Sequence, residues 1–220
     1  AYNNRGNSYA GLEQYERAIE DYDRAIELNP DLAEAYSGRG NSYNGLKHYE
    51  LAIEDFDKAI EIEPEDAGAY VNRGISYDGL GQYERAIEDF DKAIEIESDK
   101  EVLAIAYLNR GNSYNGLKQY ERAIEDFDKA IELDPKKAVA YFNRSVSYAG
   151  LEQHERAIED LNKAIEIKSD LVDAYINRGI SYARMEEFAR AIDDCTKAIG
   201  LQPENSSAYA LRSMIYTNIN

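Results

Sequence analysis

The chain has 220 residues, 44% of them hydrophobic and 31% charged, and its formal net charge is -18. This apolar content supports a packed core and argues against full disorder, while no apolar run reaches the length of about eighteen residues that a membrane span needs. The negative charge argues against nucleic-acid binding, because phosphate backbones are bound through clustered Lys and Arg. One cysteine excludes an internal disulfide, and two histidines argue against a histidine-rich metal site. The chain begins at Ala1 without a methionine or a signal-like segment, so we expect a fragment or a processed piece of a protein. The expected location is cytoplasmic.

One segment recurs along the whole chain. Tyr36 begins the string YSGRGNSYNGLKHYELAIEDFDKAIEIE, closely similar strings begin at Tyr2, Tyr70, Tyr107, Tyr141 and Tyr175, and half of it begins at Tyr209. With these tyrosines set at repeat position 4, six full repeats cover about residues 1–32, 33–66, 67–103, 104–137, 138–171 and 172–205, and a terminal helix covers 206–220. Internal repeats of this length predict a single solenoid over 1–220.

Each repeat is predicted to form two helices. In the second repeat, Ala33 to Leu46 carries small and aromatic residues at helical spacing, and Tyr49 to Glu63 has an apolar stripe with charges opposite. Proline follows the second helix in four repeats and is expected to end it there, at Pro30, Pro64, Pro135 and Pro203. Ser98 and Ser169 stand at the same place in two other repeats, where we expect helix caps.

An insertion of three residues separates the third and fourth repeats, within SDKEVLAIAY. Ser98 and Glu101 have the spacing of a capping box, and three residues are close to one helical turn. The sequence therefore predicts that the first helix of the fourth repeat starts one turn early. A longer solvated loop is the alternative.

The second repeat resembles the tetratricopeptide repeat family, which has an aromatic at position 4, small residues at 8, 20 and 27, aromatics at 11 and 24, and proline at 32. The matching residues are Tyr36, Gly40, Tyr43, Ala52, Phe56, Ala59 and Pro64, and the match recurs six times. The resemblance implies an all-α, right-handed solenoid of stacked antiparallel helix pairs, with the first helix of each pair lining a concave groove. Small residues would allow close helix approach, and the buried aromatics would fill the gaps.

The resemblance also implies that positions 2, 5, 6, 9 and 12 face the groove. Apolar residues at positions 5 and 9 of the later repeats suggest a hydrophobic track for a partner segment, and asparagines suggest amides that pair with a peptide backbone. The alternatives are tight packing of the apolar residues between repeats, and local hydrogen bonding of each Asn. The predicted groove residues are Asn4, Val71, Asn72, Ile75, Leu108, Asn109, Asn112, Phe142, Asn143, Val146, Ile176, Asn177 and Ile180.

No residue pattern indicates catalysis, a metal site or a cofactor. All nineteen tyrosines occupy repeating framework positions, which favours core packing, and Cys195 replaces a position 24 aromatic, which favours a small core residue. Acidic pairs such as Asp55 with Asp57, or Asp89 with Asp91, lie within a helical pattern rather than in a calcium loop, so we expect a solvated helix face.

Charge is distributed unevenly over the repeat. The groove positions contain no Lys or Arg, which argues against the carboxylate clamp of some family members, and Glu34, Asp78 and Asp173 are their acids. The seven position 7 arginines are expected to pair with helix acids. Most of the excess acid falls on the second helices, where we expect a solubilising outer coat.

These observations favour a protein–protein interaction scaffold that binds a peptide or helix of a partner protein in its groove. The first alternative is a substrate-presenting arm of an enzyme whose catalytic domain is absent. The second is head-to-tail self-association through the terminal repeats, because half a repeat leaves four apolar residues with few partners: Leu211, Met214, Ile215 and Ile219.

Overall fold

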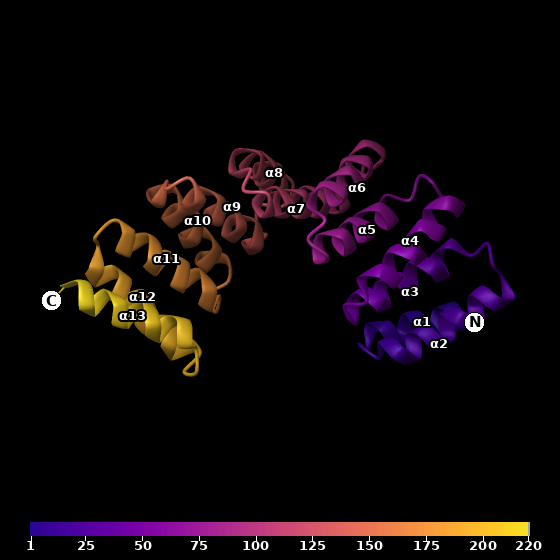
Figure 1. Cartoon of the computed structure of the whole chain (residues 1–220), viewed down its shortest axis with the longest axis horizontal. Coiled ribbons are helices and arrows are strands. Elements are labelled where there is room, and N and C mark those ends of the chain that lie inside the picture. Colours follow the sequence, from indigo (N-terminus) through magenta and orange to yellow (C-terminus); the bar gives the residue numbers. More distant parts are fainter. Residues whose placement is uncertain (220) are drawn as a thin grey trace. The chain divides into compact units, whose positions relative to one another are not determined.

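A computed structural model describes residues 1–219 and the side chains of residues 1–218, and all the regular structure in this part of the chain is helical. The chain divides into two compact units, residues 1–117 and 118–220. Unit 1 contains the first seven helices (Figure 1): α1 (Tyr2–Gly11), α2 (Tyr15–Leu28), α3 (Ala33–Gly45), α4 (Tyr49–Ile62), α5 (Ala67–Gly79), α6 (Tyr83–Ile96) and α7 (Lys100–Gly116).

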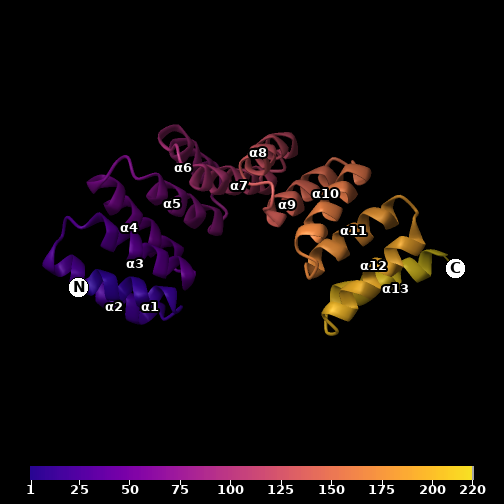
Figure 2. The ribbon, with the colours of Figure 1, turned by 180° about the vertical axis from the view of Figure 1, so that it is seen from behind.

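Unit 2 contains six helices: α8 (Tyr120–Leu133), α9 (Ala138–Gly150), α10 (His154–Ile167), α11 (Val172–Arg184), α12 (Phe188–Leu201) and α13 (Ser206–Ile219). Within each unit, every helix packs beside the next one in the chain, and the view from behind shows the same order (Figure 2). The predicted all-α repeat solenoid of antiparallel helix pairs is thereby confirmed. The helices of the second repeat end within one residue of the predicted positions.

The curvature of each unit follows from which helices meet. In unit 1, α1 contacts α3, α3 contacts α5, and α5 contacts α7; in unit 2, α11 contacts both α9 and α13. Within each unit, the even-numbered helices of the described residues contact only odd-numbered ones. The stack is therefore tighter on the side of the odd-numbered helices, and we call this side of each unit its concave face.

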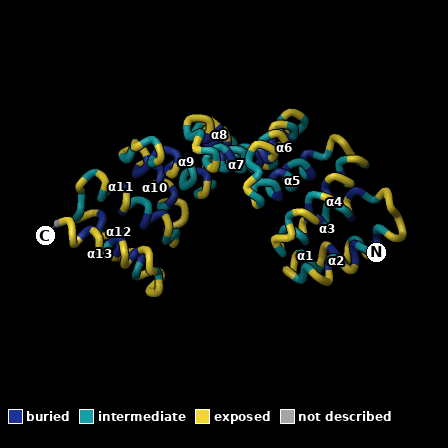
Figure 3. The backbone as a smooth tube through the Cα atoms, viewed as in Figure 1, coloured by how far each residue is buried: buried dark blue, intermediate teal, exposed yellow. Residues whose placement is uncertain are grey.

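The core repeats one packing contact. Phe56 and Phe90 are fully buried at position 24. A Cβ added to Gly40 would lie 2.9 Å from the ring of Phe56, and one added to Gly74 would lie 2.7 Å from the ring of Phe90. Carbon atoms normally approach to about 3.5–4.0 Å, so glycine is needed where the helix backbone meets the ring. Buried residues accordingly line the helix sides that face a neighbour, while the connections are exposed (Figure 3).

The turn between the two helices of a repeat contains a residue with positive φ, which is Gly81 (72°) in the third repeat and a charged residue elsewhere, such as Lys47 (60°). A left-handed conformation at a non-glycine residue costs roughly 1–2 kcal/mol. Hydrogen bonds offset this cost, because the turn lets backbone amides donate to the last carbonyls of the helix, as in the bond from His48 N to Tyr43 O at 2.8 Å.

The three inserted residues extend a helix, as predicted. Helix α7 has 17 residues, whereas α5 and α9 have 13. Its N-cap is Asp99, whose carboxylate accepts hydrogen bonds from the amides of Glu101 at 2.8 Å and Val102 at 3.2 Å. The predicted cap at Ser98 was wrong, because an aspartate one residue later offers a charged acceptor to the positive helix end. Ser169 is not a cap either, since α11 begins after Leu171.

Candidate functional site

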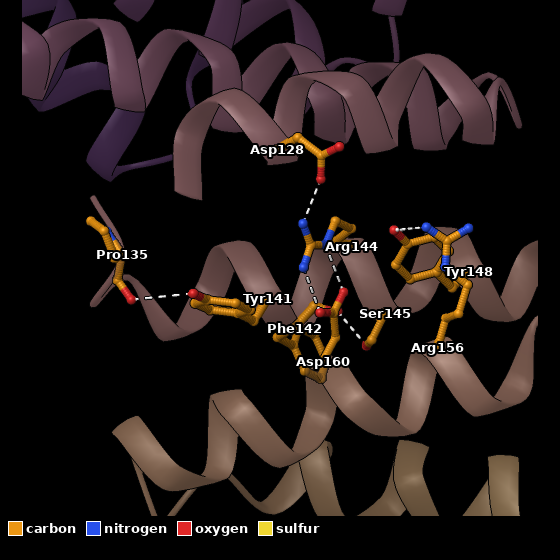
Figure 4. Close-up of polar contacts among 9 residues, drawn as sticks. All are labelled: Asp128, Pro135, Tyr141, Phe142, Arg144, Ser145, Tyr148, Arg156 and Asp160. Atoms are coloured by element: carbon orange, nitrogen blue, oxygen red, sulfur yellow. Dashed lines mark hydrogen bonds and ion pairs between the residues drawn. The ribbon is translucent and has the colours of Figure 1, made fainter. Parts of the chain in front are cut away.

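A relay of arginines and aspartates joins the helices. In unit 2, Arg144 on α9 donates to both carboxylate oxygens of Asp160 on α10, at 2.7 and 2.6 Å, and also to Asp128 on α8 (Figure 4). In unit 1, Arg39 likewise binds Asp55 of its own repeat and Asp23 of the preceding one. The predicted pairing with helix acids is therefore confirmed for these two arginines and for four others at position 7: Arg5, Arg73, Arg110 and Arg178. The prediction is not confirmed for Arg212, which lies beside the ring of Tyr209.

The same relay corrects the prediction that the acidic pairs form a solvated helix face. Asp55 and Asp89 are buried, and each accepts two hydrogen bonds from one guanidinium, while Asp57 reaches the arginine of the following repeat. The helical pattern alone could not show this, because adjacent repeats bring each arginine over both aspartates. Part of the acidic excess is therefore structural rather than a solvent-facing coat.

Position in the stack changes the electrostatics of this pair. At the open end of unit 1, the hydrogen bond from Arg5 lowers the pKa of Asp21. Inside the stack, desolvation raises the pKa of Asp55 although Arg39 opposes this. The side chain of Arg5 is 60% exposed and that of Arg39 is 20% exposed, which explains the difference.

The tyrosines only partly follow the prediction of core packing. Tyr22, Tyr148 and Tyr175 are buried, whereas the others are half-buried or exposed. Many of the half-buried rings lie beside guanidiniums, as in the contact of Arg39 with Tyr36 at 5.7 Å from the ring centre. The prediction failed where a ring packs on the edge of the relay, because a repeating position does not reveal how much solvent reaches it.

The predicted groove residues differ in exposure. At position 5, Val71, Leu108 and Ile176 are 4%, 8% and 8% exposed, so they pack between helices and offer little surface to a ligand. At position 9, Val146 and Ile180 are 39% and 40% exposed on the concave face of unit 2. Phe142 and Ile75 are half-buried.

Two adjoining cavities open on the concave face of unit 2. The first has a volume of about 180 Å³, and its lining comes from α9, α10 and α11: Ser145, Val146, Ala149, Leu161, Asn177, Ile180 and Ser181. The second has a volume of about 510 Å³, and its lining comes from α11 and α13: Ile180, Ala183, Arg184, Ala210, Leu211, Met214 and Asn218. Because Ile180 lines both, they form one continuous, mainly apolar surface.

The predicted asparagines have several surroundings. Asn177 lines the first cavity, and its side-chain amide has no hydrogen bond within the described residues. Asn109 instead donates to the carbonyl of Ile105 at 2.9 Å, which is a local role. The backbone carbonyl of Asn72 accepts hydrogen bonds. Asn4 is exposed, and Asn112 and Asn143 are half-buried with interactions of their own.

Unit 1 has side-chain bridges where unit 2 has its first cavity. Asn44 on α3 accepts a hydrogen bond from Ser76 on α5 at 2.8 Å, and Asp78 on α5 accepts one from Ser113 on α7 at 2.6 Å. The corresponding position in α9 is Ala149, which has no group to reach Ser181. The cavity therefore lies where a bridging side chain is missing and where Leu161 replaces the aromatic at position 24.

Sequence reasoning missed four residues of this cavity. They are Ser145, Ala149, Leu161 and Ser181, none of which is among the predicted groove residues. The signal was present in the fifth and sixth repeats, which both have alanine at position 12 and a non-aromatic residue at position 24.

The remaining predictions concern single residues. Cys195 is buried in the core of unit 2, as predicted, and burial raises the pKa of its thiol. Of the apolar residues behind the self-association alternative, Leu211 and Ile215 are buried and Met214 is 51% exposed, while the side chain of Ile219 lies outside the described residues.

Two kinds of feature are absent from the described residues. No cluster of three or more His, Cys, Asp or Glu side chains that could hold a metal ion occurs among them. None of their helices combines the length and apolar character that crossing a bilayer requires.

Comparison with known proteins identifies the repeat. A family model described as "Tetratricopeptide repeat" matches residues 1–32, 33–66, 67–100, 104–137 and 172–205. Two related models match residues 127–159 and 147–186. None of the curated protein sequences compared with the chain matches it.

Solved structures are similar over most of the chain. YrrB, described as a TPR protein with an unusual peptide-binding site, is 26% identical with a TM-score of 0.67, over 89% of this chain and 99% of its own. PilW, a type IV pilus biogenesis factor, is 19% identical with a TM-score of 0.87, over 96% of both chains. PilF of Pseudomonas aeruginosa is 17% identical with a TM-score of 0.84, over 97% of this chain and 96% of its own. The chain therefore belongs to the tetratricopeptide repeat family, whose repeats typically form non-catalytic scaffolds for protein interaction.

Proposed function

We propose that the concave faces bind a peptide segment of a partner protein, and that the first cavity of unit 2 accepts one apolar side chain of that segment. The cavity is the observation that carries the proposal. A cavity of about 150 Å³ with an apolar lining is large enough for benzene, so a volume of about 180 Å³ fits an aliphatic or aromatic side chain.

The surroundings of the cavity suit an extended peptide. Val146 and Ile180 would lose exposed apolar surface on binding, which contributes about 25 cal/mol per Å². The amide of Asn177 offers donors and an acceptor to the peptide backbone. The likeness to YrrB supports the same reading, because that protein is described as having a peptide-binding site.

The remaining predicted groove residues have different parts in this proposal. Ile75, Asn72 and Asn109 would contribute to the concave face of unit 1, and Phe142 and Asn143 to that of unit 2. Val71, Leu108 and Ile176 are buried, so they would stabilise these faces through packing between the helices. Nothing in the arrangement requires the chain to act as an enzyme's substrate-presenting arm, which stays an alternative.

The test is selection from a phage-displayed library of random dodecapeptides on the full chain. Ile180→Asp places a charge at the cavity, and we expect it to weaken capture of the selected peptides about tenfold or more, since burying one aliphatic side chain contributes roughly 1.5–3 kcal/mol. Ile167→Asp is the matched control, because Ile167 is also 40% exposed but ends α10. Equal capture by both variants would contradict the proposed site.

A further inference from the structure

The bridge at Asp78 is chemically different from the bridge beside it. Asn44 accepts from the hydroxyl of Ser76 through its oxygen and donates through its amide nitrogen to the carbonyl of Asn72, at 3.3 Å. Asp78 accepts from Ser113 in the same way but, as a carboxylate, has no hydrogen to donate. For the bridge alone, asparagine would serve better than aspartate.

Asp78 also differs from the buried aspartates of the second helices. Asp55 and Asp89 are each held by two hydrogen bonds from an arginine. Asp78 is half-buried, and its partner within the described residues is the hydroxyl of Ser113, with no Lys, Arg or His at ion-pair distance. Burial raises the pKa of its carboxyl, while the hydrogen bond from Ser113 opposes this.

A carboxylate is costly to bury without a cation. Its neighbours on the concave face of unit 1 cannot supply one, because repeat positions 2, 5, 6, 9 and 12 contain no Lys or Arg. The net charge of -18 attracts a cationic ligand to the protein from a distance. A ligand that brings a positive charge would give Asp78 the pairing that arginine gives to Asp55 and Asp89.

We propose that Asp78 determines specificity on the concave face of unit 1 by binding a protonated amine or guanidinium of the peptide ligand. This rests on the function proposed above and adds the chemical class of the ligand. A lysine or arginine side chain and a free peptide N-terminus share this chemistry. A hydrogen-bonded charge pair of this kind is expected to change affinity about tenfold or more.

The experiment uses the same dodecapeptide library on the wild-type chain, on Asp78→Asn and on Asp31→Asn. Asp78→Asn keeps an oxygen for Ser113 and so preserves the bridge. Asp31→Asn removes an equal charge from the exposed connection between α2 and α3. We expect the wild type and Asp31→Asn to select peptides with a cation at one fixed place, and Asp78→Asn to lose that preference.

Calorimetry of one selected peptide then tests the contact itself. Asp78→Asn and loss of the cation from the peptide should each weaken binding about tenfold or more, and the two losses should not add, because they remove the same contact. Lysine to norleucine, arginine to citrulline and N-terminal acetylation distinguish the three sources. Selected peptides without a fixed cation, or equal affinity for Asp78→Asn and Asp31→Asn, would overturn this inference alone. Failure of the wild type to select any peptide would overturn the proposed function as well.

Discussion

Alanine at two equivalent glycines should have opposite effects on stability. Gly79 and Gly11 are the last residues of α5 and α1 and occupy the same repeat position. A Cβ on Gly79 would lie 2.7 Å from the ring of Tyr49 of the preceding repeat, whereas a Cβ on Gly11 would meet nothing within 4 Å. The two sites differ because no tyrosine of a preceding repeat lies against Gly11.

The magnitude follows from two opposing terms. Replacing helical glycine by alanine stabilises by up to about 1 kcal/mol. The clash at Gly79 requires a shift of close to 1 Å to reach normal carbon contact, and such overpacking costs typically about 1–3 kcal/mol. We therefore expect Gly11→Ala to stabilise unit 1 by up to about 1 kcal/mol and Gly79→Ala to destabilise it by about 1 kcal/mol.

Urea unfolding followed by circular dichroism measures both variants, and both report on unit 1. The double variant Tyr49→His with Gly79→Ala should recover part of the loss, since a smaller ring leaves room for the methyl group. If Gly79→Ala were as stable as Gly11→Ala, the close packing of tyrosine on glycine would not be a determinant of repeat stacking.

Three further predictions concern charges and caps. Arg39→Met should destabilise the fold by about 3–5 kcal/mol, because it leaves the buried Asp55 without its cation. Arg5→Met, at the open end of unit 1, should cost far less stability. Equal losses of stability in urea unfolding would contradict the role of burial. Asp99→Ala should cost about 1 kcal/mol by removing the cap of α7, whereas Ser98→Ala should be neutral in the same assay. Asp78→Asn should stabilise the fold at neutral pH, and this advantage should shrink as the pH falls toward about 3.9, the unfolded pKa of aspartate. The pKa of Asp78 is raised in the folded state, so the folded wild type holds this proton more tightly than the unfolded chain does. The stability of the wild type therefore falls as the pH rises through the folded pKa. A stability difference between Asp78→Asn and the wild type that is independent of pH in urea unfolding would contradict this prediction.

The helices and their packing were predictable because they depend on patterns within a single repeat. Glycine opposite an aromatic residue, proline two residues after a helix, and arginine sixteen residues before aspartate recur at fixed spacing. The cap of α7 was not predicted correctly, since Ser98 and Asp99 both suit a helix start. Only the structure shows that Asp99 takes the role.

The candidate site was less predictable because exposure depends on how neighbouring repeats meet. Ile75 and Ile180 are both isoleucines at position 9 of first helices, yet Ile75 is half-buried and Ile180 is 40% exposed. Hydrophobic periodicity predicts which face a residue occupies but not how closely the next helix covers that face. The cavity beside Val146 depends on the absence of a side chain at Ala149, which becomes visible only when its bridge is compared with that of Asn44.

The repeats provide an internal comparison that separates framework from function. The arginine relay is retained in both units, and it links helices on the sides where they pack. The departures that matter here fall instead on the concave faces, where Asp78 replaces a bridging amide and Ala149 removes one. Stacking energy comes from nearest-neighbour interfaces in repeat proteins, so a change on the concave face that spares the relay leaves the fold intact. A scaffold built in this way holds a constant backbone while successive repeats present a carboxylate, an amide or an apolar cavity to a ligand. This separation explains how nearly identical repeats form two concave faces of different chemistry.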